Sequence, residues 1–249
     1  DPWERASKNH PDIDVVNFRS IDNPVFLRAE YERARQNLPA WKFFMNYDGL
    51  FTRPSGLIYD CFDERRHKIP RFALPDHWQR FLGLDFGGVN TAGIFYAQEP
   101  KTRRVFAYRE YRAGGRTAAE HVKALIAGEP MLPICAGGSK SEGQWRDEFA
   151  AAGLPVYEPD VSSVEVGIDR VYGGHKRGQI YVFEDLHGYL DEKLSYSREL
   201  DDLGEPTEKI ADKESFHVLD AERYILPSVL PEPPEEYDAE EEVTVLRVR

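Results

Sequence analysis

Cysteine is scarce in this chain of 249 residues, which contains only Cys61 and Cys135. Two thiols cannot form a disulfide framework, and Cys135 lies in an apolar run where a free thiol usually acts as a small hydrophobic side chain. Long apolar runs are also missing, because none approaches the roughly 20 residues that a membrane span needs. The first residues lack the basic-then-apolar order of a signal peptide. We therefore expect a cytoplasmic protein with reduced thiols and no membrane partner.

The chain also lacks an excess of positive charge, since its net charge at pH 7 is -12. This value argues against a passive nucleic-acid coat, because affinity for DNA of any sequence comes mainly from Lys and Arg that neutralise phosphates. It does not exclude an enzyme that acts on DNA. Residues 232–249 include seven acids and are expected to form an acidic tail. Basic residues cluster at 65–68, 103–116 and 175–177, and a solvated surface is the alternative to a binding site for each cluster.

From about residue 76 the apolar residues follow regular patterns, and the hydrophobic share of 41% is ordinary for a globular protein. Three apolar runs separated by turn residues predict three consecutive strands, after which helical and strand patterns alternate. This order predicts an α/β fold over 76–231, in which a three-strand meander continues into a mixed sheet flanked by helices. The predicted strands are 81–86, 92–97, 104–111, 132–136, 154–157 and 179–183, and the predicted helices are 118–126, 142–152, 164–174 and one that begins near Ser215.

Three pairs of residues have the spacing of a helix capping box, in which a Ser or Thr is followed three residues later by Glu. Each pair predicts the start of a helix. The pairs are Thr117 with Glu120, Ser139 with Glu142, and Ser162 with Glu165.

Residues 1–75 have a different pattern. A helix is predicted at 25–38, after which prolines and glycines interrupt short extended pieces. We expect this segment to pack on another structure, as the end of a preceding domain, rather than to form a core of its own.

The run from Phe81 to Gly88 is the most informative part of the chain, because an apolar strand ends on Asp85 and two glycines follow. A half-buried carboxylate is costly unless its charge is compensated. A metal ion or a ring of backbone N–H groups could provide that compensation. A turn cap beside the glycines is the alternative.

Other acids are predicted near the ends of neighbouring strands. Glu110 lies near the end of the third strand, and Glu142 follows the fourth. His217 and Asp220 are three residues apart, so they project from one face of the last predicted helix. Such a set would hold one or two hard divalent cations, Mg²⁺ or Mn²⁺ rather than Zn²⁺. Two ions about 4 Å apart can activate water and stabilise the leaving oxygen in phosphodiester hydrolysis.

Each of these residues also has a simpler interpretation. Glu142 completes a capping box, Glu110 fits an exposed strand face, and His217 fits a buried histidine with satisfied hydrogen bonds. Asp220 lies among apolar residues, where an unpaired acid would be costly, so a functional role is favoured for it.

At these residues the sequence resembles the nuclease domain of a tailed-phage terminase large subunit. The resemblance rests on Gly83-Leu84-Asp85-Phe86-Gly87, on Phe216-His217-Val218-Leu219-Asp220-Ala221-Glu222-Arg223-Tyr224, and on the order of elements between them. The stretches 20–24 and 49–59 resemble the segment that leaves the ATPase domain in that family. The resemblance implies a ribonuclease H-like fold for 76–231 and the end of the ATPase-to-nuclease linker for 1–75.

The resemblance implies a metal-dependent endonuclease that cuts concatemeric double-stranded DNA by a two-metal mechanism with little sequence preference. Asp85 would be the first ligand of Mg²⁺ or Mn²⁺ and Asp220 the last, with His217 as an auxiliary ligand. The family often places its middle acid at the end of the fourth strand, where this chain has Gly137-Gly138. Glu142 is the best substitute, which makes Asp85, Glu142 and Asp220 the expected catalytic set, with Glu110 as a further candidate.

The implied partners are double-stranded DNA, the portal protein, the small terminase subunit and the ATPase domain of the same polypeptide. The implied location is the cytoplasm of the infected host cell, with transient attachment to the procapsid portal. No Gly-x-x-x-x-Gly-Lys-Ser/Thr phosphate loop occurs in the sequence, so this chain is not expected to be the complete motor. The residues expected to contact DNA phosphates are Arg109, Arg112, Lys140, Lys176 and Arg177.

Two other functions stay open. The run from Asp85 to Thr91 also resembles the first phosphate loop of actin-like and sugar-kinase ATPases, although the chain is short for that class. Alternatively, the domain is a non-catalytic docking piece of the packaging motor, with the acidic tail binding a basic partner.

Overall fold

The computed structural model describes residues 18–37, 40–49, 56–87, 90–202 and 205–230. The chain divides into two compact units, which we describe separately. The first comprises the described residues up to Tyr59 together with Leu194–Lys213, and the second comprises Asp60–Lys193 and the described residues from Glu214 onward. The predicted acidic tail, 232–249, lies outside the described residues.

The first unit contains short helices and a small two-stranded sheet. The helix predicted at 25–38 is α2, Arg28–Asn37, which begins late because the Asn23 side chain and carbonyl accept hydrogen bonds from the next turn. A further helix, α3, was not predicted, and its Phe43 packs edge-on against Tyr31 of α2. The elements of this unit are η1 (Ser20–Asp22), α2, α3 (Ala40–Tyr47), β8 (Arg198–Leu200) and β9 (Pro206–Ile210).

The second unit is built on a seven-stranded mixed sheet, in the order β1-β7-β4-β3-β2-β5-β6. The predicted meander is confirmed, since β2, β3 and β4 pair antiparallel, while β5 pairs parallel to β2 and β7 pairs parallel to β4. The strands are β1 (Lys68–Ile69), β2 (Gln79–Phe86), β3 (Asn90–Gln98), β4 (Val105–Gly114), β5 (Ile134–Gly137), β6 (Val156–Tyr157) and β7 (Ile180–Phe183). The helices are α4 (Glu64–His67), α5 (Ala118–Ile126), η2 (Lys140–Glu142), α6 (Gly143–Ala151), α7 (Val164–Lys176), α8 (His187–Ser195), η3 (Lys213–Ser215) and α9 (His217–Val229).

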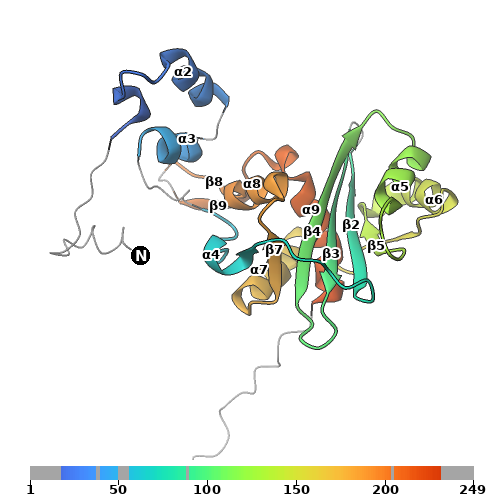
Figure 1. The fold of residues 1–249 in the computed structure, drawn as a ribbon. Coiled ribbons are helices and arrows are strands. Elements are labelled where there is room, and N and C mark those ends of the chain that lie inside the picture. Colours follow the sequence, from blue (N-terminus) through green and yellow to red (C-terminus); the bar gives the residue numbers. More distant parts are fainter. Residues whose placement is uncertain (1–17, 38–39, 50–55, 88–89, 203–204, 231–249) are drawn as a thin grey trace, which may run out of the picture. The chain divides into compact units, whose positions relative to one another are not determined.

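Helices cover both faces of the sheet, with α5 and α6 on one face and α9 on the other (Figure 1). Strand alternation assigns the side chains of β2 to these faces. Leu82, Leu84 and Phe86 join the hydrophobic core beneath α5 and α6. Gly83 faces α9, because a Cβ at that position would lie 2.0 Å from the Ala221 carbonyl oxygen. Asp85 is two residues further along the same face, so the alternation directs it toward α9.

The capping boxes at Thr117 and Ser139 are both present, as predicted. The third is displaced by one residue, since Ser163 rather than Ser162 caps α7 and accepts from the Val166 N–H. Strand β1 was not predicted either. Its two residues pair with β7, in a stretch that the sequence assigned to the linker. No described helix has the length and apolar composition to cross a membrane.

Candidate active site

Asp85 and His217 meet where the end of β2 approaches the start of α9. The His217 Nδ1 lies 2.8 Å from an Asp85 carboxylate oxygen, and the two side chains are 32% and 14% exposed. Both are partly open to solvent, so the pair is accessible to a ligand. His217 is thus not the buried histidine of the simpler interpretation.

Asp220 lies one turn along α9 from His217 and adds a second carboxylate. Its oxygen accepts a hydrogen bond from the buried Arg223 guanidinium. Burial raises the pKa of Asp85 above its ordinary value, the His217 hydrogen bond opposes this, and the nearby charges of Asp220 and Glu142 raise it further. The surroundings therefore disfavour the charged form of Asp85, which a bound cation would stabilise.

Glu142 lies within electrostatic reach of Asp85, but its carboxylate has another partner. It accepts a 2.6 Å hydrogen bond from the Ser139 N–H in the capping box that begins η2. The capping interpretation therefore holds in this structure. A role as metal ligand would require the carboxylate to use its second oxygen or to leave the cap.

Glu110 is committed to a different helix. Its carboxylate accepts hydrogen bonds from the backbone N–H groups of Gly188 and Tyr189, at 3.1 and 2.5 Å. These bonds satisfy free donors in the first turn of α8. Glu110 pairs with Ile94 across the sheet, which itself pairs with Gly83, so it lies two strands away from β2. The structure gives Glu110 a capping role, and we do not retain it as a ligand.

Two of the five predicted DNA contacts lie at the end of the sheet that carries Asp85. Arg112 pairs with Ala92, the partner of Asp85, and its side chain is 49% exposed. Lys140 is exposed in η2 at the end of β5.

The other three lie elsewhere. Arg109 donates to the carbonyl oxygens of Ala124, Leu125 and Ala127 at the end of α5 and forms an ion pair with Glu129. Its guanidinium is thus used inside the fold. Lys176 and Arg177 end α7 just before β7, whose Ile180 pairs with Val105 at the start of β4, the strand end opposite to Asp85. We therefore drop these three as contacts near the site.

A residue that the sequence analysis missed, Glu192 of α8, holds the start of α9. One of its oxygens accepts from the N–H groups of Val218 and Leu219, at 3.0 and 3.1 Å. The other binds the guanidinium of Arg112. Burial raises the pKa of Glu192 to about 7, against the effects of Arg112 and the two N–H groups. In the sequence, Glu192 is simply an acid in a segment that precedes the predicted last helix. That position does not distinguish it from acids on the protein surface.

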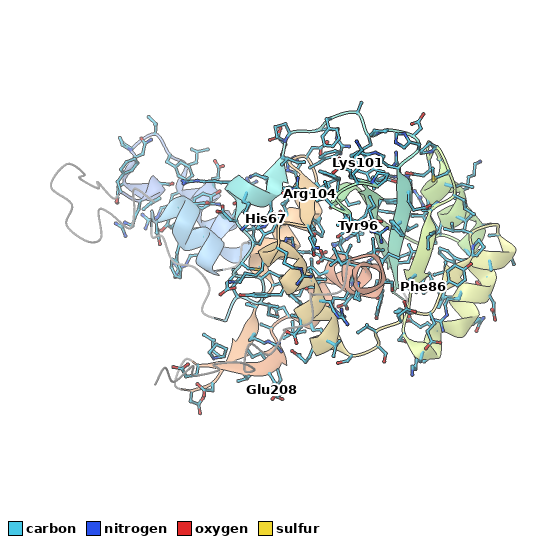
Figure 2. All side chains as sticks on the ribbon, turned by 90° about the horizontal axis from the view of Figure 1, so that it is seen from below. His67, Phe86, Tyr96, Lys101, Arg104 and Glu208 are labelled. Carbon is cyan, nitrogen blue, oxygen red and sulfur yellow. The ribbon has the colours of Figure 1, made fainter. Side chains whose placement is uncertain are left out.

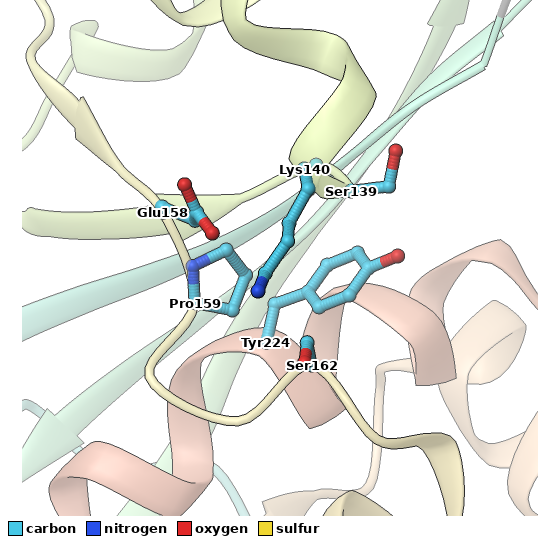
Figure 3. A pocket seen from close by; sticks show the side chains of 7 residues that line it. Ser139, Lys140, Glu158, Pro159, Ser162 and Tyr224 are labelled. Carbon is cyan, nitrogen blue, oxygen red and sulfur yellow. The ribbon is translucent and has the colours of Figure 1, made fainter.

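A pocket of about 230 Å³ lies between the turn after β5 and α9, the helix that carries Asp220 (Figure 3). It is bounded by the turn after β5, by the segment after β6 and by Tyr224, which lies one turn beyond Asp220 on α9. Burial, followed by the charges of Asp220 and Asp85, raises the pKa of Tyr224 to about 12. The lining residues are Gly138, Ser139, Lys140, Glu158, Pro159, Ser162 and Tyr224.

The donor set at this edge of the sheet fits a hard cation that keeps part of its water. Within the described residues, no three His, Cys, Asp or Glu side chains come close enough to hold an ion by themselves. Mg²⁺ is usually bound through one or two carboxylates, with water and substrate phosphate completing its octahedron. Asp85 and Asp220 fit that pattern, since they are two partly exposed carboxylates whose mutual repulsion a cation would relieve.

Comparison with known proteins identifies the fold. Neither a protein-family model nor a curated protein sequence matches the chain. Solved structures of phage terminases do match. The nuclease domain of the P22 large terminase has a TM-score of 0.58 at 24% identity, over 70% of this chain and 92% of that chain. The large terminase nuclease from the thermophilic phage G20c, with bound magnesium, has a TM-score of 0.52 at 15% identity, over 70% of this chain and 97% of that chain.

A longer protein matches as well. The large terminase from another thermophilic bacteriophage has a TM-score of 0.59 at 18% identity, over 89% of this chain. This chain spans 57% of the length of that protein. The predicted resemblance is thereby confirmed at the level of the fold, which is the mixed α/β fold of the ribonuclease H-like terminase nucleases.

Proposed function

We propose that this chain is the nuclease part of a phage terminase large subunit, and that it hydrolyses phosphodiester bonds of double-stranded DNA with the help of Mg²⁺ or Mn²⁺. The observation that carries the proposal is the pair of partly exposed carboxylates, Asp85 at the end of β2 and Asp220 in the first turn of α9, which are near enough for the charge of one to raise the pKa of the other. The shared fold supports it, as does the magnesium bound to the G20c nuclease.

The residues of this chain would have separate roles. Asp85 and Asp220 would hold the cation, which when bound supplies a Lewis acid for the attacking water and the leaving oxygen. His217 would orient the Asp85 carboxylate through its 2.8 Å hydrogen bond, and Arg223 would do the same for Asp220. Because Glu142 is used in a helix cap, its assignment as the middle ligand, and with it the second ion, stays a prediction.

The proposed partners follow from the same relationship. Double-stranded DNA is the proposed substrate, and the portal protein, the small terminase subunit and the ATPase domain of the same polypeptide are the proposed assembly partners. The proposed place of action is the cytoplasm of an infected cell.

Plasmid cleavage in Mn²⁺, Mg²⁺ or EDTA tests the proposal. The wild type is expected to cut only with metal, and Asp85→Asn and Asp220→Asn are each expected to reduce the rate by at least about 100-fold, the scale on which misplaced or missing catalytic groups act. Asp147→Asn is the matched control, because this acid is exposed on α6, which covers the other face of the sheet. A folded wild type that binds metal but does not cut would contradict the proposal and favour the docking function.

A further inference from the structure

The pocket at this end of the sheet has a lysine and three hydroxyl-bearing residues in its walls, and the carboxylate that also lines it, from Glu158, lies 3.9 Å from the Arg146 guanidinium. Lys140 extends into it, with its ammonium between Pro159, Tyr224 and Ser162 (Figure 3). Within the described part of the chain, no carboxylate lies within ion-pair distance of this ammonium. Ser139, Ser162 and Tyr224 also line the pocket.

The turn that carries Lys140 is held in place before any ligand arrives. The Arg146 guanidinium donates to the carbonyl oxygens of Gly137 and Ser139, at 3.2 and 2.8 Å. The Gly138 N–H donates to the carbonyl oxygen of Leu84, the residue before Asp85, at 3.1 Å. Such preorganisation lowers the entropic cost of binding.

Close packing also accounts for the two glycines that stand where an acid was expected. A Cβ at Gly137 would lie 2.3 Å from the Leu84 carbonyl oxygen, and one at Gly138 would lie 2.7 Å from the Phe86 ring. Gly138 has a φ of 73°, which favours glycine. The turn therefore excludes a carboxylate and places a lysine at the site instead.

The position of the pocket relates it to the proposed reaction. Tyr224 and Asp220 are four residues apart on α9, which corresponds to about 6 Å along the helix. Neighbouring phosphates of one DNA strand lie further apart than the axial rise of about 3.4 Å, because the strand winds around the helix axis, and their separation is comparable with this distance. A strand that brings one phosphate to the aspartates would therefore bring a neighbouring phosphate to the pocket.

We infer that this pocket binds the phosphate and deoxyribose next to the scissile phosphate, with the Lys140 ammonium as the partner of the phosphate. The inference rests on the proposed nuclease function. At about 230 Å³ the pocket is below the size of typical drug-binding clefts, about 300–1,000 Å³, so it admits one sugar-phosphate unit rather than a duplex.

The test measures binding of a fluorescein-labelled 30-base-pair duplex in Ca²⁺, by anisotropy, over 50 to 200 mM salt. Lys140→Ala should make the slope of log K against log salt shallower by about 0.9, which corresponds to the loss of one phosphate contact. The ratio of wild-type to variant affinity should therefore fall about threefold between the lowest and the highest salt concentration. Lys101→Ala is the matched control. Lys101 lies in the turn between β3 and β4, away from Phe86 at the site end of β2 (Figure 2). It should leave the slope unchanged.

A second variant distinguishes binding inside the pocket from a contact between DNA and Lys140 at the edge of the pocket. Ser162→Phe keeps the charge but fills the cavity, and it should reduce metal-dependent cleavage at least tenfold while the melting temperature stays unchanged. An unchanged salt slope for Lys140→Ala, or full cleavage by a folded Ser162→Phe, would overturn the inference and leave the nuclease function standing. A wild type that neither binds DNA nor cuts it would refute both.

Discussion

The buried ion pair between Lys193 of α8 and Glu222 of α9 allows a quantitative prediction. Both side chains are 0% exposed, and the ammonium lies 2.6 Å from a Glu222 oxygen. The other oxygen accepts hydrogen bonds from the Tyr189 and Tyr96 hydroxyls, at 2.5 and 3.1 Å. Burial lowers the pKa of Lys193, and Glu222 opposes this shift through its charge and its hydrogen bond, so the carboxylate stabilises the charged form of the ammonium.

Glu222→Gln removes the charge and keeps the shape. Removing one partner of a buried pair leaves an uncompensated charge and costs about 3–5 kcal/mol, a large share of the about 5–15 kcal/mol by which a typical domain is stable. The double variant Lys193→Met, Glu222→Leu has no such charge. A well-packed apolar replacement is often neutral or stabilising, but here the two tyrosine hydroxyls lose their acceptor, at about 1–3 kcal/mol each when unsatisfied.

We therefore expect the double variant to be clearly less destabilised than the sum of the two single variants. Urea unfolding at pH 7, followed by tryptophan fluorescence, gives the free energies of the wild type, the single variants Lys193→Met and Glu222→Leu, and the double variant for a double-mutant cycle, and Glu222→Gln is measured beside them. Additive losses, or a loss of less than about 1 kcal/mol for Glu222→Gln, would show that the pair contributes no more than a surface salt bridge does.

Three further predictions concern the site and its supports. Asp85→Asn should raise the melting temperature of the metal-free protein at pH 7, because the raised pKa of Asp85 means that the fold disfavours its charged form. Calorimetry should show that this gain becomes smaller as the pH falls through the pKa of Asp85, and an unchanged melting temperature at pH 7 would contradict the prediction. Glu192→Ala should reduce cleavage about tenfold or more because α9 loses an anchor, whereas Glu192→Gln keeps an acceptor and should retain most of the rate; equal losses would argue against positioning. Gly137→Ala should cost about 1–3 kcal/mol in urea unfolding, since its Cβ meets the Leu84 carbonyl oxygen at 2.3 Å, and a neutral result would mean that the turn can shift.

The parts of the fold that follow from local patterns could be predicted from the sequence. Strand alternation and apolar runs identified β2 to β7, and capping spacing placed the starts of α5 and η2. Asp85 could be proposed as a site residue because an acid at the end of an apolar strand conflicts with its surroundings. His217 and Asp220 could be proposed as site residues because their spacing places both on one face of a helix.

The parts that depend on distant partners could not be predicted in this way. Arg109 and Glu110 are residue types that also occur in DNA-binding and metal-binding sites. In this structure Arg109 donates to a carbonyl oxygen at the end of one helix, and Glu110 accepts from an N–H group at the start of another. In the sequence, Glu192 cannot be distinguished from an acid on an exposed helix face, because its role depends on its contact with the start of α9. The short strand β1 has two residues, too few for a periodic pattern, and exists through its pairing with β7.

Helix α9 links stability to the proposed chemistry, because one short segment serves both. The Glu222 side chain points into the core and holds Lys193, while Asp220, two residues earlier, is presented at the rim with 16% of its side chain exposed. Gly83 allows the helix backbone to contact β2, which brings Asp220 and Asp85 to the same edge. A change that lifts the helix from the sheet, such as Gly83→Ala, must therefore separate the two carboxylates as well as the core. Stability and metal affinity should consequently fall together in that variant, whereas Asp85→Asn should separate them by raising the first and abolishing the second.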